Sequence, residues 1–346
     1  MQILAIMRIE HYRYVYFEPQ ALDYPLGKEL YREFSGRDDV EVRYTTSHNR
    51  VTGLVTAPPQ RAFAAAKRTL VVGVKRSLEF SSCRPSAHYQ LPLATGCPGM
   101  CRYCYLHTTL GHRPYVRVYV NRDAILKRVC EYIRERSPKL TVFEGAATSD
   151  PLAVEPLTGS LALAIEFFAQ QPLGRFRFTT KYAYLQGLLR LEHGGHTRIR
   201  FSINAQRYIE RFETGTLPLD QRLHACRRTG EAGYPVGIMV APIFLDKGWQ
   251  KEYHELIKKV ALVCGDLPDL TVELITHRYT KRARKNIEAM FPEHGLPMDD
   301  AVRSFKYGQF GYGKYVYPGQ RLKEAERQFA DWCGEHLPHS RIDYLV

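Results

Sequence analysis

The sequence predicts an α/β fold built from consecutive β/α units in the middle of the chain. Two observations lead to this class: short apolar runs alternate with segments of helical periodicity, and the two flanks lack that alternation. With 346 residues and 45% hydrophobic content, the chain can bury one large core, or a barrel with an accessory piece. Parallel strands joined by helices form either a doubly wound sheet or a barrel, and periodicity alone leaves both open.

Six β/α pairs are predicted to follow one another. The helix predicted at residues 122–136 carries its apolar side chains on one face, namely Ile125, Val129, Tyr132 and Ile133. The strand and helix of each pair are predicted at residues 88–94 and 122–136, 140–143 and 157–168, 175–180 and 184–191, 198–203 and 219–232, 234–243 and 250–263, and 270–276 and 281–290. In either fold class, ligands are expected at the carboxyl ends of these strands.

The flanks differ from this middle region. Residues 1–85 are predicted to form an accessory segment packed on the α/β region of residues 86–300, with a helix at residues 25–34. In the C-terminal part, residues 301–346, aromatic and basic residues alternate around glycines. That pattern predicts a β-hairpin with its turn near Gly311 or Gly313. A helix at about residues 321–335 is predicted to follow.

Charge and aromatic content favour a polyanionic partner. The formal net charge is +13, and the chain contains 23 Tyr and 16 Phe, a balance suited to a nucleic acid whose bases can be stacked. Basic enzymes without such partners also exist, so charge alone does not decide. The apolar start of the chain is interrupted at Arg8 and Glu10, too early for a signal peptide or a membrane span. We therefore expect a cytoplasmic protein without a membrane partner.

Three cysteines predict a metal cluster. Cys97, Cys101 and Cys104 have the spacing C-x3-C-x2-C, which gathers three thiols in one short loop. A four-iron cluster normally takes four thiolates, so three leave one iron open for a substrate or cofactor. A structural zinc site remains an alternative, although His107 and His112 do not complete a familiar zinc motif. Disulfides are not expected in a chain without a secretory signal.

Several blocks of sequence together resemble the spore photoproduct lyase family of the radical S-adenosylmethionine (AdoMet) superfamily. They are GCPGMCRYCYL at residues 96–106, FEGAATSD at 143–150, TK at 180–181, FSIN at 201–204, AP at 241–242, and the hairpin at 307–317. The resemblance implies a partial (β/α)6 barrel of the TIM type with an N-terminal accessory layer and a C-terminal β-hairpin and helix. It also implies a [4Fe-4S] cluster and AdoMet as cofactors. The implied activity is DNA repair, in which a 5'-deoxyadenosyl radical splits the methylene bridge of 5-thyminyl-5,6-dihydrothymine back to two thymines.

The resemblance also assigns site residues. It implies that the cluster is held by Cys97, Cys101 and Cys104; that AdoMet lies near Ser149, Lys181, Ser202 and Ala241; that hydrogen atoms pass through Tyr103 and Tyr105; and that the lesion is wedged by Tyr312, Lys314 and Tyr315. The AdoMet residues end predicted strands, where a barrel assembles its site. Simpler roles stay open for each group: helix caps or solvated charges, tyrosines that pack the loop, and a solvated edge hairpin.

Ala147 departs from the family pattern. Family members carry at this place a cysteine that donates a hydrogen atom to the thymine radical, and an alanine offers no comparably weak bond. Either the residue was engineered, or the protein is a natural homologue with another donor. We expect cluster, AdoMet and lesion binding to survive and the final hydrogen donation to be impaired.

The implied partners are double-stranded DNA containing spore photoproduct and an external one-electron reductant, with a monomer acting in the spore core of a spore-forming cell. Two other functions stay open: another radical AdoMet enzyme acting on RNA or a small molecule, and a non-catalytic iron–sulfur protein that binds nucleic acid.

Overall fold

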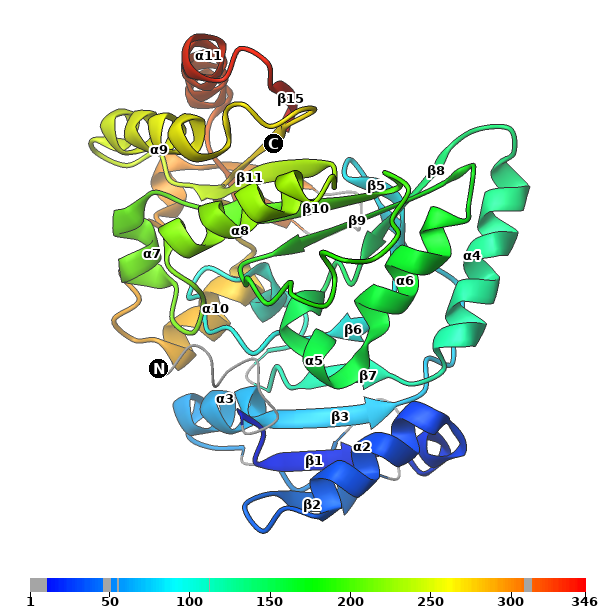
Figure 1. Ribbon diagram of the computed structural model, residues 1–346. Coiled ribbons are helices and arrows are strands. Elements are labelled where there is room, and N and C mark those ends of the chain that lie inside the picture. Colours follow the sequence, from blue (N-terminus) through cyan, green and yellow to red (C-terminus); the bar gives the residue numbers. More distant parts are fainter. Residues whose placement is uncertain (1–10, 46–50, 55, 112, 308–312) are drawn as a thin grey trace. The chain divides into compact units, whose positions relative to one another are not determined.

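The computed structural model describes residues 11–45, 51–54, 56–111, 113–307 and 313–346 (Figure 1). The chain divides into two compact units. The first comprises Met1–Gly99 and His112–Arg198, and the second comprises Met100–Gly111 and Ile199–Val346. The division therefore falls inside the cysteine loop, between Cys97 and Cys101.

The first unit contains a five-stranded sheet built mainly from the N-terminal part of the chain. Its order is β2-β1-β3-β7-β6, with all neighbours parallel except β6 and β7. The strands are β1 (Tyr14–Phe17), β2 (Glu41–Tyr44), β3 (Thr69–Gly73), β6 (Ala94–Thr95) and β7 (Val116–Tyr119). Every residue of β3 is buried, as expected for a central parallel strand. The helices of this part are η2 (Pro19–Asp23), α2 (Pro25–Ser35) and α3 (Pro59–Lys67).

The first unit also holds the first strands of the predicted β/α series. They follow the order β9-β8-β5-β4, in which β5, β8 and β9 are parallel. Their bounds are β4 (Ser82–Cys83), β5 (Ala87–Leu91), β8 (Thr141–Gly145) and β9 (Gly174–Thr180). The helix predicted at residues 122–136 is confirmed as α4 (Arg122–Arg136). The strand predicted at residues 88–94 is divided, because β5 ends at Leu91 and Ala94 belongs to β6 of the other sheet.

Two helix predictions in this unit need correction. The segment 157–168 is interrupted at Gly159, whose φ of 56° is left-handed, so that η4 (Pro151–Val154) and α5 (Glu155–Thr158) precede α6 (Ser160–Ala169). The Glu155 carboxylate accepts hydrogen bonds from the first backbone N–H groups of α6. The helix predicted at residues 184–191 is wrong, because the segment forms turns. Leu185 and Leu188 are buried at helical spacing, but a single turn satisfies that spacing.

The second unit holds the remaining strands in the order β15-β12-β11-β10, all parallel. They are β10 (Thr197–Ile203, which enters from the first unit), β11 (Val236–Ile243), β12 (Thr271–Thr276) and β15 (Arg341–Leu345). The helices are α7 (Gln206–Phe212), α8 (Leu219–Glu231), α9 (Trp249–Cys264), α10 (Lys281–Met290) and α11 (Gly319–His336). The short helices are η3 (Tyr105–Thr108) and η5 (Asp300–Val302). The predicted C-terminal helix is confirmed as α11, whereas β15 was not predicted.

The predicted hairpin consists of β13 (Ser304–Tyr307) and β14 (Gly313–Val316), which are antiparallel. Residues 308–312, including Gly311, lie outside the described residues, and Gly313 begins β14. No single helix in the described part of the chain is long and apolar enough to cross a membrane. Among the described helices, one pair, Pro151–Thr158 and Ser160–Ala169, passes the test when both helices are counted together, and this pair is bent by 97°.

Candidate cluster and cofactor site

The first-unit end of the cysteine loop is fixed by the strand-end motif, residues 146–150, which follows β8. The backbone N–H of Gly96 donates to the carbonyl oxygen of Thr148 at 2.9 Å, and the Ser149 hydroxyl donates to the carbonyl oxygen of Gly96. Gly96 has a left-handed φ of 75°, and a Cβ there would lie 2.2 Å from the carbonyl oxygen of Tyr115. Glycine is therefore required directly before Cys97. The beginning of the cysteine block at residues 96–106 and the end of the block at residues 143–150 therefore lie side by side.

The surroundings of Cys97 suit a thiolate or a cluster sulfur. Tyr12 is 1% exposed, and its hydroxyl has no hydrogen-bond partner among the described residues. Burial and the charge of Cys97 raise the pKa of Tyr12 above its usual value. A buried hydroxyl without an acceptor is costly, and a cluster on the three cysteines would supply one. The residues present therefore fit an iron–sulfur cluster at this loop.

The second-unit end of the loop is held by the chain that follows α7. The N–H of Met100 donates to the carbonyl oxygen of Thr214 at 2.8 Å, and the N–H of Arg102 donates to that of Phe212 at 2.9 Å. The N–H of Cys104 closes a turn on the carbonyl oxygen of Cys101 at 3.2 Å. The backbone that carries these two thiols is therefore fixed within the second unit.

Tyr103 belongs to a buried charge network that the sequence analysis missed. Its hydroxyl donates to one carboxylate oxygen of Glu213, and the other carboxylate oxygen accepts from Arg222 at 2.6 Å. The side chains of Glu213 and Arg222 are both 0% exposed. Burial and the neighbouring carboxylate raise the pKa of Tyr103 well above its usual value. The carboxylate is thus placed to hold the phenolic proton.

The same network reaches the predicted AdoMet residues of the second unit. Arg222 donates to the carbonyl oxygen of Ser202 at 3.0 Å, which ties α8 to β10. Ser202 is buried and pairs with Met239 of β11, the strand that carries Ala241. Asn204 donates to the carbonyl oxygen of Pro242 at 2.8 Å. Ser202 and Ala241 therefore lie at the carboxyl ends of neighbouring parallel strands.

Ser149 and Lys181 follow neighbouring parallel strands of the first unit. Asp150, between them, accepts hydrogen bonds from the Thr180 hydroxyl at 2.8 Å and from the backbone N–H of Lys181 at 2.7 Å. Burial raises the pKa of Asp150 to about 6, and these hydrogen bonds act in the opposite direction. Asp150, for which the sequence predicted no role, therefore orders the backbone around both predicted residues.

Ala147 lines a cavity of about 90 Å³ in the first unit. The cavity lies between the strand-end motif and the end of β7, and polar side chains in its lining include Lys75, Gln90, Thr95 and Tyr119. Ala146, directly before Ala147, has a left-handed φ of 47°, unusual for a residue with a Cβ. A sharp backbone turn thus presents position 147 to a partly open cavity with polar lining.

The hairpin presents aromatic and basic side chains of the second unit. Tyr315 stacks on Tyr279 with ring centroids 5.3 Å apart, and its backbone N–H donates to the carbonyl oxygen of Tyr279. Lys314 lies opposite Lys306 across the hairpin. Tyr307 is 79% exposed and was not singled out in the sequence. The predicted wedge residue Tyr312 lies outside the described residues.

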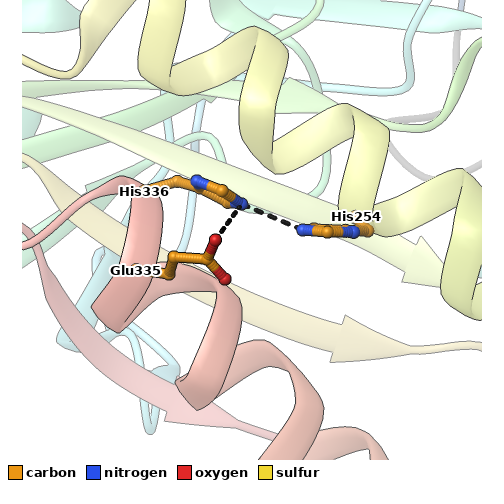
Figure 2. A group of neighbouring side chains, drawn as sticks. All are labelled: His254, Glu335 and His336. Atoms are coloured by element: carbon orange, nitrogen blue, oxygen red, sulfur yellow. Dashed lines mark hydrogen bonds and ion pairs between the residues drawn. The ribbon is translucent and has the colours of Figure 1, made fainter.

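Figure 2 shows a second group of possible metal ligands, His254 on α9 with Glu335 and His336 on α11. The Nε2 atoms of the two histidines are 2.9 Å apart. A metal ion bound to both atoms at about 2.05 Å would have an N–metal–N angle of about 90°. The tetrahedral angle preferred by zinc would require the two nitrogens to lie about 3.3 Å apart. The rings are inclined by 27° with centroids 5.1 Å apart, so the nitrogens meet edge to edge. The pair is therefore a hydrogen bond that joins α9 to α11, with His254 stacked on Trp332.

Comparisons with known proteins agree with the resemblance seen in the sequence. The sequence model of the family described as spore photoproduct lyase matches residues 11–346. The chain is 47% identical to spore photoproduct lyase of Geobacillus sp. (strain Y412MC61), covering 96% of this chain and 98% of the relative. It is 44% identical to spore photoproduct lyase of Bacillus subtilis (strain 168), covering 96% and 97%.

Solved structures extend this similarity to the fold. A spore photoproduct lyase mutant with bound AdoMet and dinucleoside spore photoproduct matches with a TM-score of 0.94 and 48% identity, covering 97% of this chain and 99% of that one. Spore photoproduct lyase complexed with dinucleoside spore photoproduct matches with a TM-score of 0.94 and 47% identity over the same shares. These matches confirm the predicted fold class, a mixed α/β fold with a curled half-barrel sheet.

Proposed function

Because the chain belongs to the spore photoproduct lyase family of radical AdoMet lyases, we propose that it repairs spore photoproduct in double-stranded DNA by splitting the methylene bridge back to two thymines. The observation that carries the proposal is the cysteine loop, in which Cys97, Cys101 and Cys104 follow one another on fixed backbone. A glycine turn and a strand-end motif hold its beginning, and the chain after α7 holds its end. Such a loop suits a cluster with one open iron.

In this proposal the three cysteines hold a [4Fe-4S] cluster, and AdoMet lies among Ser149, Lys181, Ser202 and Ala241. When bound, these cofactors supply a 5'-deoxyadenosyl radical that takes hydrogen from the lesion. The Lys181 ammonium can pair with the AdoMet carboxylate, and the serine hydroxyls can hydrogen-bond to polar groups. The position of each pair at the ends of neighbouring strands supports this assignment. The chain itself contributes orientation and the exclusion of water.

Tyr103 and Tyr105 are proposed as the hydrogen-atom relay. In this relay the Tyr103 hydroxyl gives a hydrogen atom to the product radical, so that its electron and its proton pass to the same acceptor, and the phenoxyl radical is then restored by taking one hydrogen atom back. The Glu213 carboxylate orients the phenol through its hydrogen bond. Arg222 gives that buried carboxylate a counter-charge. Tyr105 is 61% exposed, so packing in a core does not account for it.

The hairpin is proposed to grip the damaged DNA. A lesion in a duplex must be flipped out to reach an enclosed site, and aromatic side chains such as Tyr312 and Tyr315 can fill the gap it leaves. Lys306 and Lys314 stand opposite each other, an unfavourable like-charge pair that a phosphate group between them would relieve. In this proposal residues 301–346 contact the lesion, residues 86–300 form the barrel, and residues 1–85 pack on it. A monomer acts in the spore core with an external one-electron reductant.

Anaerobic turnover tests the function. We expect the reconstituted and reduced protein, with AdoMet and dinucleotide spore photoproduct, to give deoxyadenosine and thymine products by mass spectrometry. Cys104→Ala should lose both, because two thiolates cannot hold a four-iron cluster. Cys130→Ala, which removes a half-buried thiol of α4, should keep both. His254→Ala is the control for adventitious metal on the histidine pair. Cofactor cleavage with an unchanged lesion would refute the substrate, and binding of nucleic acid without any deoxyadenosine would refute the enzyme activity.

DNA affinity should depend steeply on salt. If the hairpin and the basic surface contact about four phosphates, affinity for lesion-containing duplex should fall about 10²-fold between 50 and 200 mM salt, because bound counterions are released. Lys306→Ala and Lys314→Ala together should reduce the slope by about two, measured by fluorescence anisotropy. Lys258→Ala, on the exposed face of α9, serves as the control. An unchanged slope in the double variant would contradict phosphate binding by the hairpin.

A further inference from the structure

We propose that Lys67 and Tyr12, two residues of the N-terminal part of the chain, are positioning residues for the iron–sulfur cluster. Lys67 fixes the beginning of the cysteine loop, the Tyr12 hydroxyl donates a hydrogen bond to a sulfur of the bound cluster, and both make the cluster easier to reduce. This inference rests on the proposed function, because it requires a cluster on Cys97. It gives residues 1–85 a specific task for which the sequence offered none.

Lys67 is an uncommon lysine. It ends α3, is 4% exposed, and its ammonium donates to the carbonyl oxygens of Cys97 and Gly99, both at 2.6 Å. A further contact is the ring of Phe63, 5.2 Å away. Among the described residues no carboxylate forms an ion pair with Lys67, so a full positive charge is buried against two neutral acceptors.

A buried charge of this kind needs a compensating charge. Three thiolates and a four-iron core carry a net negative charge in both redox states, and that charge increases by one on reduction. The Lys67 ammonium beside the loop backbone would therefore stabilise the reduced cluster more than the oxidised one. It also restrains residues 97–99, which set the direction of the first thiol.

Tyr12 supplies the second contact. It precedes β1, and its buried hydroxyl lacks a partner among the described residues while interacting electrostatically with Cys97. An unsatisfied buried hydroxyl costs about 1–3 kcal/mol, and a thiolate or sulfide sulfur is an acceptor that removes this cost. Hydrogen bonds to cluster sulfurs withdraw electron density and raise the reduction potential.

The two residues are held together by the N-terminal sheet. The His11 imidazole lies 2.7 Å from the carbonyl oxygen of Lys67, and the backbone N–H of Arg13 donates to the carbonyl oxygen of Arg68 at 2.9 Å. The two neighbours of Tyr12 in the chain are therefore hydrogen-bonded to the backbone of Lys67 and Arg68, at the end of α3. A change in either side chain leaves this backbone pairing in place.

The test is an EPR-monitored redox titration of the reconstituted full-length protein, together with its iron content. We expect Lys67→Met to lower the midpoint reduction potential by at least about 59 mV, which is a tenfold change in the equilibrium constant of a one-electron reduction. Lys67→Arg should restore most of the shift, because it keeps the charge. Tyr12→Phe should shift the midpoint in the same direction by a smaller amount. Lys28→Met, which removes an exposed charge from α2, should leave it unchanged.

The possible outcomes separate this inference from the function it rests on. If Lys67→Met and Tyr12→Phe bind full iron at an unchanged midpoint, the inference is overturned. If Lys67→Met assembles no cluster, Tyr12→Phe decides in its place: a midpoint shifted to lower potential supports the inference, and an unchanged midpoint overturns it. A parent protein that assembles no cluster would refute the proposed function itself.

Discussion

Ala147→Cys is expected to raise the yield of intact thymine per lesion opened by at least several-fold. In the proposed mechanism, a thiol at this place offers a weak S–H bond to the radical left after the methylene bridge breaks, whereas the alanine offers none. The left-handed backbone at Ala146 and the cavity of about 90 Å³ show that a sulfur atom can be placed there. The measurement is the ratio of thymidine to other nucleoside products for each deoxyadenosine formed, by mass spectrometry.

Two variants decide whether hydrogen donation is the cause. Ala147→Ser adds a side chain of similar size but with a strong O–H bond, so it should not improve the ratio. Cys83→Ala removes the half-buried thiol of β4, two residues from the cavity-lining Ser81. If the serine variant performs as well as the cysteine variant, polarity explains the gain. If Cys83→Ala abolishes clean repair in the Ala147 protein, that thiol is already supplying the hydrogen atom.

Long, regular elements of the fold could be predicted from the sequence. The helix at residues 122–136 has apolar positions on one face over about two and a half turns, and the structure confirms it to the residue. The segment 184–191 offers only Leu185 and Leu188 as a helical signal, and one turn satisfies both. The strand β15 was missed because four of its five residues are partly exposed, so no continuous apolar run marks it. Short segments take their structure from tertiary packing.

The residues of the candidate site also fall into two groups: those that a local sequence pattern predicts, and those that only the folded chain reveals. The cysteine triplet is local, so its spacing alone predicts a cluster. Glu213 and Lys67 lie far along the chain from the residues they serve, and a lone Glu or Lys in sequence is most often a solvated charge. Only the folded chain shows that both are buried, Glu213 against Tyr103 and Lys67 against the backbone of the cysteine loop.

Glu213→Gln is expected to slow repair by about 10²-fold, the loss that a slightly misplaced reacting group causes. An amide keeps the shape of the carboxylate but lacks its charge, so it accepts a weaker hydrogen bond from Tyr103 and orients the phenol less well. The same change leaves the buried Arg222 without its counter-charge, which should lower the free energy of unfolding by about 3–5 kcal/mol. Steady-state repair of the dinucleotide lesion and urea unfolding measure the two effects.

Matched variants separate catalysis from stability. Tyr103→Phe removes the relay but keeps the Glu213–Arg222 pair, so repair should fall with a much smaller loss of stability. Glu213→Gln combined with Arg222→Met removes the unpaired charge, so stability should recover while repair stays slow. If the double variant recovers repair together with stability, Glu213 only supports the fold. If repair stays low in both the double variant and Tyr103→Phe, the carboxylate and the phenol act on the same hydrogen atom.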